Sequence, residues 1–386
     1  MNRLTRMQAT ALVIGVIALA VCAAAGGMNR TQVFVSYHFS YLFWLGLTLG
    51  CFSVTMIHHL TGGRWGYPVR RFFEAGFGTL TLMTLLFIPI VFGRHYLFPW
   101  ARPEEVARDE TLQFRQQYMS LWPFLIRAVF FFTVWNLIAR YLRKYSLEQD
   151  QTPDAAPTRK LRTLSGPGIV LFPLTATFAY VDWVMSTEPH WYSTMFALIV
   201  LIGQILLAYS FGVVLITAFR RREPLCGAVT TTHYHHLGNL LLTFVMFWTY
   251  ISFGQLLIIY SGNLPREIEW YLHRIAGNWL WVVGALGLFH FFVPFFLLLF
   301  RTVKRQIAPL TTIAAMLFLA HIVQVYWLVV PSFHQQGLQC SWLDLAAFLG
   351  VGGIWISVFL AQLKAAPLLP QHDPGGQFTL VYAPVH

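Results

Sequence analysis

The sequence predicts an all-α integral membrane protein with about ten transmembrane helices. Only 11% of its 386 residues are Asp, Glu, Lys or Arg. Soluble proteins carry roughly 25%, so a soluble globule of this length could not cover its surface. Apolar types make up 57% of the chain, and they gather in runs of about 20 residues, the length of a helix that crosses the hydrocarbon core. The same composition excludes a disordered chain, a collagen and a disulfide-rich secreted scaffold.

Ten candidate spans follow from these runs. They cover residues 7–25, 37–61, 72–93, 119–140, 167–187, 192–219, 234–261, 277–300, 308–330 and 341–363. The first run has the basic start and small-residue end of a signal peptide, but Val21 rather than a small residue precedes Cys22, so a lipoprotein box is absent. We therefore expect a retained signal anchor, and a single polytopic membrane domain over residues 1–386.

Basic residues in the connecting segments predict the orientation. With ten spans both termini lie on one side, and the segments on that side hold 18 Lys and Arg residues against seven on the other. This asymmetry follows the positive-inside rule, so we expect a multi-pass membrane protein with both termini cytoplasmic. Topology also explains the net charge of +11, and no nucleic-acid partner is expected, since one would need a continuous basic surface.

Two connecting segments are long enough to have structure of their own. The external segment 94–118 is aromatic and mixed in charge, which predicts a partly helical stretch on the membrane surface. The internal segment 141–166 is rich in Gln, Asp, Pro and Thr, which predicts a mobile linker.

No cofactor motif stands in the chain. It contains four widely separated cysteines without a CxxC or CxxCH pattern, Cys22, Cys51, Cys226 and Cys340. Haem c, an iron–sulfur cluster or a zinc site is therefore not expected. The adjacent histidine pairs 58–59 and 235–236 lack the spacing of b-type haem ligands, and there is no Walker loop, GxGxxG turn or HExxH motif. We expect no catalytic residue, metal or redox centre in this chain.

Charged residues inside the spans are functional candidates, because a charge in the bilayer core is costly. At 1.5 Å rise per residue, Arg127 lies about 10–12 Å and Asp182 about 6–8 Å below the outer surface, so the two are expected to pair. Glu74 opens span three close to His58 and His59, which close span two. A carboxylate beside imidazoles at a cytoplasmic mouth suits proton uptake. In both places the alternative is structural: an ion pair between helices, or interfacial polar residues that reach water.

Histidines in the second half form a similar series. His236 lies at the inner mouth of span seven, while His290 and His321 reach the middle of the bilayer from spans eight and nine. Gln204 in span six has a similar depth. These side chains predict a hydrated proton path, with hydrogen bonding between helices as the alternative.

The turn between spans five and six carries the remaining polar cluster. Asp182, Glu188 and His190 lie there with Trp191 at the outer interface. The rings alone would make an ordinary aromatic belt. With two carboxylates and a histidine, the turn is a candidate proton exit. It is also a candidate quinol-binding lip formed by His190, Asp182 and Trp191.

Two segments resemble a known family. The run DWVMSTEPHWYSTMF at 182–196 and the run YHFSYLFWLG at 37–46 resemble the ActF-type second large membrane subunit, or quinone-binding subunit 2, of bacterial alternative complex III. That complex is a quinol:electron-acceptor oxidoreductase, and the subunit is related to NrfD/PsrC-type membrane subunits. The resemblance implies two four-helix bundles, spans two to five (about 37–187) and six to nine (about 192–330), flanked by spans 7–25 and 341–363.

The resemblance also implies partners and a function. Quinol oxidation, with menaquinol or ubiquinol, would take place in a sister NrfD-like subunit beside an iron–sulfur subunit and haem c subunits. Small membrane subunits, membrane lipids and a terminal oxidase are further expected partners. This chain would be a cofactor-free subunit of the respiratory electron-transport chain in the bacterial inner membrane, where it would support assembly and transmembrane proton transfer. From the matching run, Asp182, Glu188 and His190 are carried over. The alternatives are a direct quinol-binding subunit and a solute transporter.

Overall fold

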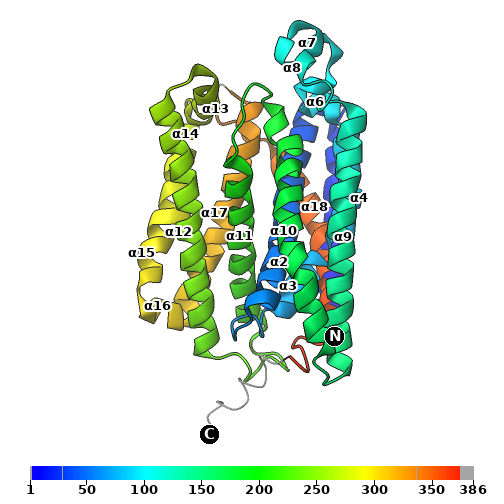
Figure 1. Ribbon diagram of the computed structural model, residues 1–386, viewed down its shortest axis with the longest axis vertical. Helices are drawn as coiled ribbons and strands as arrows, with labels where there is room; N and C mark the ends of the chain where they lie inside the picture. The colour runs from blue at the N-terminus through cyan, green and yellow to red at the C-terminus, as the bar shows by residue number, and fades with distance from the viewer. Residues whose placement is uncertain (1, 28, 336, 374–386) are drawn as a thin grey trace.

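The computed structural model describes residues 2–27, 29–335 and 337–373, and it is an all-helical membrane bundle (Figure 1). The structure is 80% helical, and no strand occurs in these ranges. Within them, ten helical segments are long and apolar enough to cross a membrane. The predicted all-α integral membrane class is therefore confirmed.

The spans follow the predicted order. They are α1 (Asn2–Ala25), α2 (Arg30–Thr61), the broken span α3 (Arg70–Phe77), α4 (Leu80–Leu86) and α5 (Ile88–Phe92), then α9 (Leu121–Gln151), α10 (Ala156–Trp183), α11 (Phe196–Phe219), α12 (Thr231–Gly262), the broken span α14 (Trp279–Leu286), η3 (Gly287–Phe292) and α15 (Val293–Leu299), α17 (Ile307–Val329) and α18 (Trp342–Lys364). Short helices lie between them: α6 (Arg94–Leu97), η1 (Pro99–Ala101), α7 (Pro103–Arg108), α8 (Glu110–Phe114), η2 (Met185–Thr187), α13 (Pro265–Ile275), α16 (Arg301–Arg305) and η4 (Val330–Ser332).

The prediction of a mobile linker at 141–166 is wrong. Helix α9 continues to Gln151 and α10 begins at Ala156, so only four residues between them are not helical. Lys, Glu, Gln and Arg are good helix formers, and hydropathy cannot distinguish a polar helix end that projects from the membrane from a loop. The external segment 94–118 is partly helical, as predicted.

Helix α2 is the centre of the bundle. It is almost entirely buried and contacts α3, α10, α11 and α18. Contacts join α2, α3–α5, α9 and α10 into one group, and α11, α12, α14–α15 and α17 into a second. The two groups meet along α2 and α11, where a Cβ on Gly50 would come 2.1 Å from the Gln204 carbonyl oxygen. Only glycine permits backbones to approach so closely.

The first and last spans pack together outside these groups. Helix α1 contacts α18 along its length, and contacts α2 only weakly. A Cβ on Gly15 would lie 2.7 Å from the Ile354 nitrogen, and one on Gly353 would lie 2.5 Å from the Ala11 carbonyl oxygen. The pair is therefore held by close backbone contact, while the rest of α1 is largely exposed.

The bundle has two ends, which we name from the chain. The N-terminal end contains the start of α1, the end of α18 and the segment between α2 and α3, and there Lys364 Nζ lies 3.4 Å from Thr5 Oγ1. The far end contains α6, α7, α8 and α13, which lie at the top of Figure 1.

The eighth span contains a π-helical turn at η3, Gly287–Phe292. Pro294 follows at the start of α15. Proline has no backbone N–H and crowds the carbonyl four residues earlier, here that of His290. A wider π turn accommodates this break, and it holds the buried His290 side chain.

Candidate functional site

The N-terminal end contains a buried cluster of charges around Glu74. Its carboxylate is fully buried and accepts hydrogen bonds from Arg70 Nε at 2.7 Å, Arg71 Nη1 at 2.6 Å and Arg143 Nη1 at 3.1 Å. Ser146 Oγ donates a further bond at 2.5 Å. A buried carboxylate is tolerated only with such partners, so Glu74 joins the third span to α9.

Two further carboxylates complete this cluster. Arg70 Nη1 binds Asp373 Oδ2 at 2.5 Å, and Arg71 Nη2 binds both carboxylate oxygens of Asp150 at 2.5 Å. The segment after α18 also contributes a backbone bond, from Gln371 N to Asp150 Oδ1 at 3.0 Å. Three guanidinium groups thus meet three carboxylates, and the segment that follows the last span is fixed against α9.

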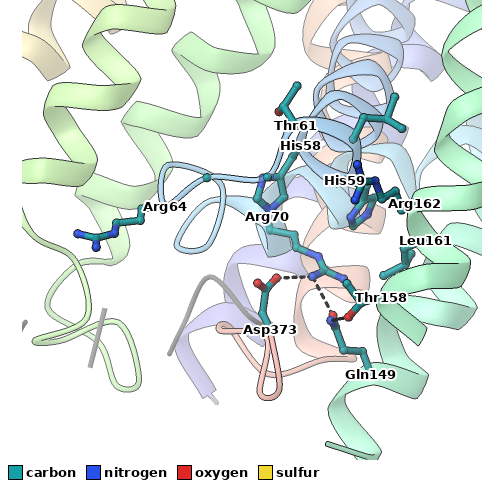
Figure 2. A pocket seen from close by; sticks show the side chains of 13 residues that line it. His58, His59, Thr61, Arg64, Arg70, Gln149, Thr158, Leu161, Arg162 and Asp373 are labelled. Atoms are coloured by element: carbon teal, nitrogen blue, oxygen red, sulfur yellow. Dashed lines mark hydrogen bonds and ion pairs between the residues drawn. The ribbon is translucent and has the colours of Figure 1, made fainter. Parts of the chain in front are cut away.

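A pocket of about 380 Å³ opens beside this cluster (Figure 2). His58 and His59 line it from the end of α2, with Arg64, Arg70 and Arg162. Glu74 does not line the pocket. Arg70 lines it and also donates a hydrogen bond to Glu74, so Arg70 connects the pocket to the charge cluster. Two rings pack near the His58 imidazole. The Trp65 centroid lies 5.0 Å and the His59 centroid 5.9 Å from the His58 centroid. The pocket combines imidazoles with an excess of cationic groups.

Arg127 and Asp182 form the predicted pair. Arg127 Nε lies 2.7 Å from Asp182 Oδ2, and Nη2 lies 3.0 Å from Oδ1. The guanidinium also stacks on the Tyr118 ring, 3.7 Å from its centroid. The pair joins α9 to α10, and Tyr118 closes it from the segment before α9.

Glu188 is paired with Arg274, which is one of the seven basic residues in the connecting segments opposite the termini. Arg274 Nη1 donates to Glu188 Oε1 at 2.7 Å, and Ser332 Oγ donates to the same oxygen at 2.6 Å. His273 Nδ1 lies 3.2 Å from Oε2. Burial alone would raise the pKa of Glu188, but Arg274 and these hydrogen bonds outweigh it and lower the pKa to about 2. This cluster ties together the three segments that follow spans five, seven and nine.

The buried Arg274 is itself held from several sides. Its Nη2 donates to the Leu328 carbonyl at 2.8 Å, and its guanidinium lies 3.8 Å from the Trp270 ring centroid. Trp270 stacks on Trp191 with centroids 4.5 Å apart. The signal that could have found Arg274 is the amphipathic segment 265–275, whose apolar Trp270 precedes Arg274 by one helical turn.

The three quinol-binding candidates do not share one site. Trp191 is buried and stacks on Trp270, and Asp182 is occupied by Arg127. His190 is half exposed, with its Nε2 2.8 Å from Asp109 Oδ2. Each of the three therefore has its own partners.

The middle of the second group contains the predicted histidine pair. The His290 and His321 rings are 5.9 Å apart, and Trp248 packs edge-on against His290 at 4.3 Å. Both histidines are buried. His321 also lines a cavity of about 20 Å³ with Gln204, Gln324 and Tyr180. Gln204 Nε2 donates to the Tyr180 hydroxyl, and Gln204 Oε1, Gln324 Oε1 and His321 Nδ1 have no partner among the described residues.

Sequence reasoning found part of this middle cluster. Gln204, His290 and His321 were expected at one depth, whereas Gln324, Tyr180 and Trp248 were not singled out. Gln324 lies three residues after His321, the spacing that places two side chains on one helix face. His236 stands apart, because it precedes Trp248 by 12 residues on α12, roughly 18 Å along the axis. The expected series His236–His290–His321 is therefore interrupted.

Metal ligation has no candidate here, since no group of three or more His, Cys, Asp or Glu side chains in the described ranges could hold a metal ion. Comparison of the sequence with protein-family models and with curated proteins gave no match.

Proposed function

We propose that this chain is a membrane subunit of a respiratory quinol:electron-acceptor oxidoreductase of the alternative complex III type, in which it supports assembly and transfers protons within the membrane. The family proposal rests on the resemblance of the runs 37–46 and 182–196. The proton-transfer proposal rests on one observation: His290 and His321 lie 5.9 Å apart in the middle of the bundle. In this proposal both termini are cytoplasmic, and haem c and iron–sulfur clusters belong to partner subunits.

The middle cluster has the chemistry that proton transfer needs. Imidazole takes up and releases a proton through its two ring nitrogens. The cavity of about 20 Å³ beside His321 is large enough for one water molecule. Such a water would have polar partners in Gln204 Oε1, Gln324 Oε1 and His321 Nδ1, which otherwise lack them in the described residues. A water in this place would connect His321 to Gln204 and Tyr180.

The three charge clusters support assembly in this proposal. Glu74 pairs with Arg143, Asp182 with Arg127 and Glu188 with Arg274, so each carboxylate joins segments that are distant along the chain. The outer face of the second group leaves large apolar rings exposed, including Tyr250 and Trp281, at 75% and 80%. Such a surface is suited to lipid and to neighbouring membrane subunits.

Purification of the tagged chain from native membranes in mild detergent tests the family proposal. We expect haem c and iron–sulfur subunits to co-purify with it, detected by haem staining and by low-temperature electron paramagnetic resonance. Purification of a chain without redox partners would overturn the proposal and favour a solute transporter.

Replacement of His321 tests proton transfer. In proteoliposomes we expect His321→Leu to lower the number of protons moved per electron while the subunits remain assembled. The control is Thr312→Val, which removes a hydroxyl from the exposed face of the same helix and should leave the ratio unchanged. An unchanged ratio in His321→Leu would exclude the histidine pair from proton transfer. Loss of quinol binding in His190→Ala would instead support a direct quinol site.

A further inference from the structure

A large groove lies at the far end of the bundle, away from the clusters described above. It has a volume of about 1010 Å³ and is formed by α1, α2 and the end of the third span. Its size is at the upper limit of small-molecule pockets, which run from about 300 to 1,000 Å³. Its lining contains no residue of the three charge clusters and neither histidine of the middle cluster.

The lining of the groove extends from its mouth into the bundle along three parts of the chain. Its lining runs from Gly26 down to Leu19 on α1 and from Arg30 to Tyr37 on α2, which is about 10 Å along each helix. The third wall runs from Tyr96 on α6 along α5 to Leu86 at the end of α4, at most about 15 Å. Half of a hydrocarbon core is about 15 Å thick. The groove therefore extends through most of one leaflet, from the membrane surface towards the midplane.

The cationic and imidazole groups of the groove lie at its mouth. Arg30 and His95 are exposed there, and Arg30 hydrogen-bonds to Tyr96. Among the described residues no carboxylate lies within ion-pair distance of Arg30. The deeper lining is apolar, and its one hydroxyl, on Tyr37, already donates to the Leu86 carbonyl at 2.6 Å. Phe34 on α2 and Tyr96 on α6 stack with ring centroids 5.2 Å apart, so two of the walls contact each other near the mouth.

We propose that this groove binds one anionic phospholipid of the far-end leaflet, with its phosphate at Arg30 and an acyl chain along α1. A cation without a carboxylate at the membrane surface complements a phosphate, and an apolar wall about 10–15 Å deep complements an acyl chain. A quinone ring would need several hydrogen-bonding groups around it, whereas the described lining below the mouth offers only the Cys22 thiol and the Tyr37 hydroxyl, which already donates to Leu86. The proposal goes beyond the proposed function and does not depend on it.

Native mass spectrometry of the purified protein, with any subunits that accompany it, tests the proposal. The protein is stripped of lipid by extended detergent washing and then given palmitoyl-oleoyl phosphatidylglycerol, or phosphatidylcholine with the same chains. We expect one phosphatidylglycerol per chain to remain bound at a detergent concentration that removes phosphatidylcholine. Equal retention of both lipids, or displacement of phosphatidylglycerol by a water-soluble quinone analogue, would overturn the proposal.

Three variants locate the lipid. Arg30→Gln removes a charged contact to the phosphate and should weaken phosphatidylglycerol retention about tenfold. Ala23→Phe fills the groove and should abolish retention, whereas Ala24→Phe, on the next residue but outside the lining, should not. Retention that is unchanged in both Arg30→Gln and Ala23→Phe would mean that lipid binds elsewhere. Arg30 is exposed, so its variant remains informative even where Ala23→Phe does not fold.

Discussion

Arg127 and Asp182 meet through two parallel hydrogen bonds, at 2.7 and 3.0 Å, inside the membrane-spanning bundle. Asp182 is almost fully buried, while the Arg127 side chain keeps 19% of its surface exposed. Removal of one partner from such a pair leaves an unpaired charge in a poorly solvated place. Each charge is therefore tolerated inside the bundle because its partner is present.

We expect Arg127→Leu and Asp182→Leu each to destabilise the protein by about 3 kcal/mol, because each leaves one uncompensated charge. The double variant should be less destabilised than the sum, with a coupling energy of about 1–3 kcal/mol. Unfolding of the four proteins in mixed micelles measures this cycle. Simple additivity would show that the two side chains act independently.

Glu74→Gln should be more damaging than a change at an exposed carboxylate. It leaves Arg70, Arg71 and Arg143 with two carboxylates in place of three, at a fully buried site, and we expect a loss of about 3–5 kcal/mol. Glu148→Gln removes the exposed ion pair with Lys160 and should change the unfolding free energy far less, because solvent screens this pair. Similar unfolding free energies for the two variants would contradict the structural role assigned to Glu74.

The stability contributed by Glu188 should depend on pH. Its pKa is lowered from the ordinary 4.5 to about 2, so the folded state binds the proton more weakly than the unfolded state. The contribution is therefore complete above about pH 4.5 and is lost as the pH falls towards 2. The difference in thermal midpoint between the protein and Glu188→Gln should be largest at pH 7 and should shrink in acid. With Glu104→Gln as the exposed control, a difference that stays constant with pH would refute this assignment.

Gly50 and Gly254 offer a matched test of helix packing. A Cβ on Gly50 would clash with the Gln204 carbonyl oxygen at 2.1 Å, whereas one on Gly254 would meet nothing within 4 Å. Gly50→Ala must push α2 away from α11 and should destabilise the protein by at least 1–3 kcal/mol, the usual range for overpacking. Gly254→Ala lies in open space on α12 and should be neutral, or stabilising by about 0.5–1 kcal/mol. Thermal unfolding in detergent compares the two variants. Equal effects on stability would contradict the close contact between α2 and α11.

The sequence predicts some parts of this protein well because the physics there is local. Hydropathy identifies the spans, since each must be apolar over the same length. The pairing of Arg127 with Asp182 follows because spans that are consecutive in sequence tend to be neighbours. Both predictions depend only on residue type and depth.

Contacts between distant segments could not be predicted in this way. Glu188 and Arg274 are 86 residues apart, and depth and hydropathy alone place Arg274 among the connecting-segment charges that set orientation. Helix α2 begins at Arg30 rather than at residue 37, where the predicted span begins. A polar side chain in its first turns has a hydrogen-bond partner far along the chain: Ser36 Oγ donates to Asp344 Oδ1 at 2.5 Å, 308 positions away. A hydropathy average counts these side chains as polar and contains no information about their hydrogen-bond partners.

The close pairing of α1 with α18 has a consequence for biosynthesis. Since α1 is held by the last span and only weakly by α2, the first of the ten spans to leave the ribosome has no firm partner until the tenth has been inserted. Helix α1 therefore remains loosely associated at the edge of the bundle while the other spans assemble. The wall that α1 gives to the lipid groove is thus fixed last, so the membrane itself can supply the occupant before the groove closes around it.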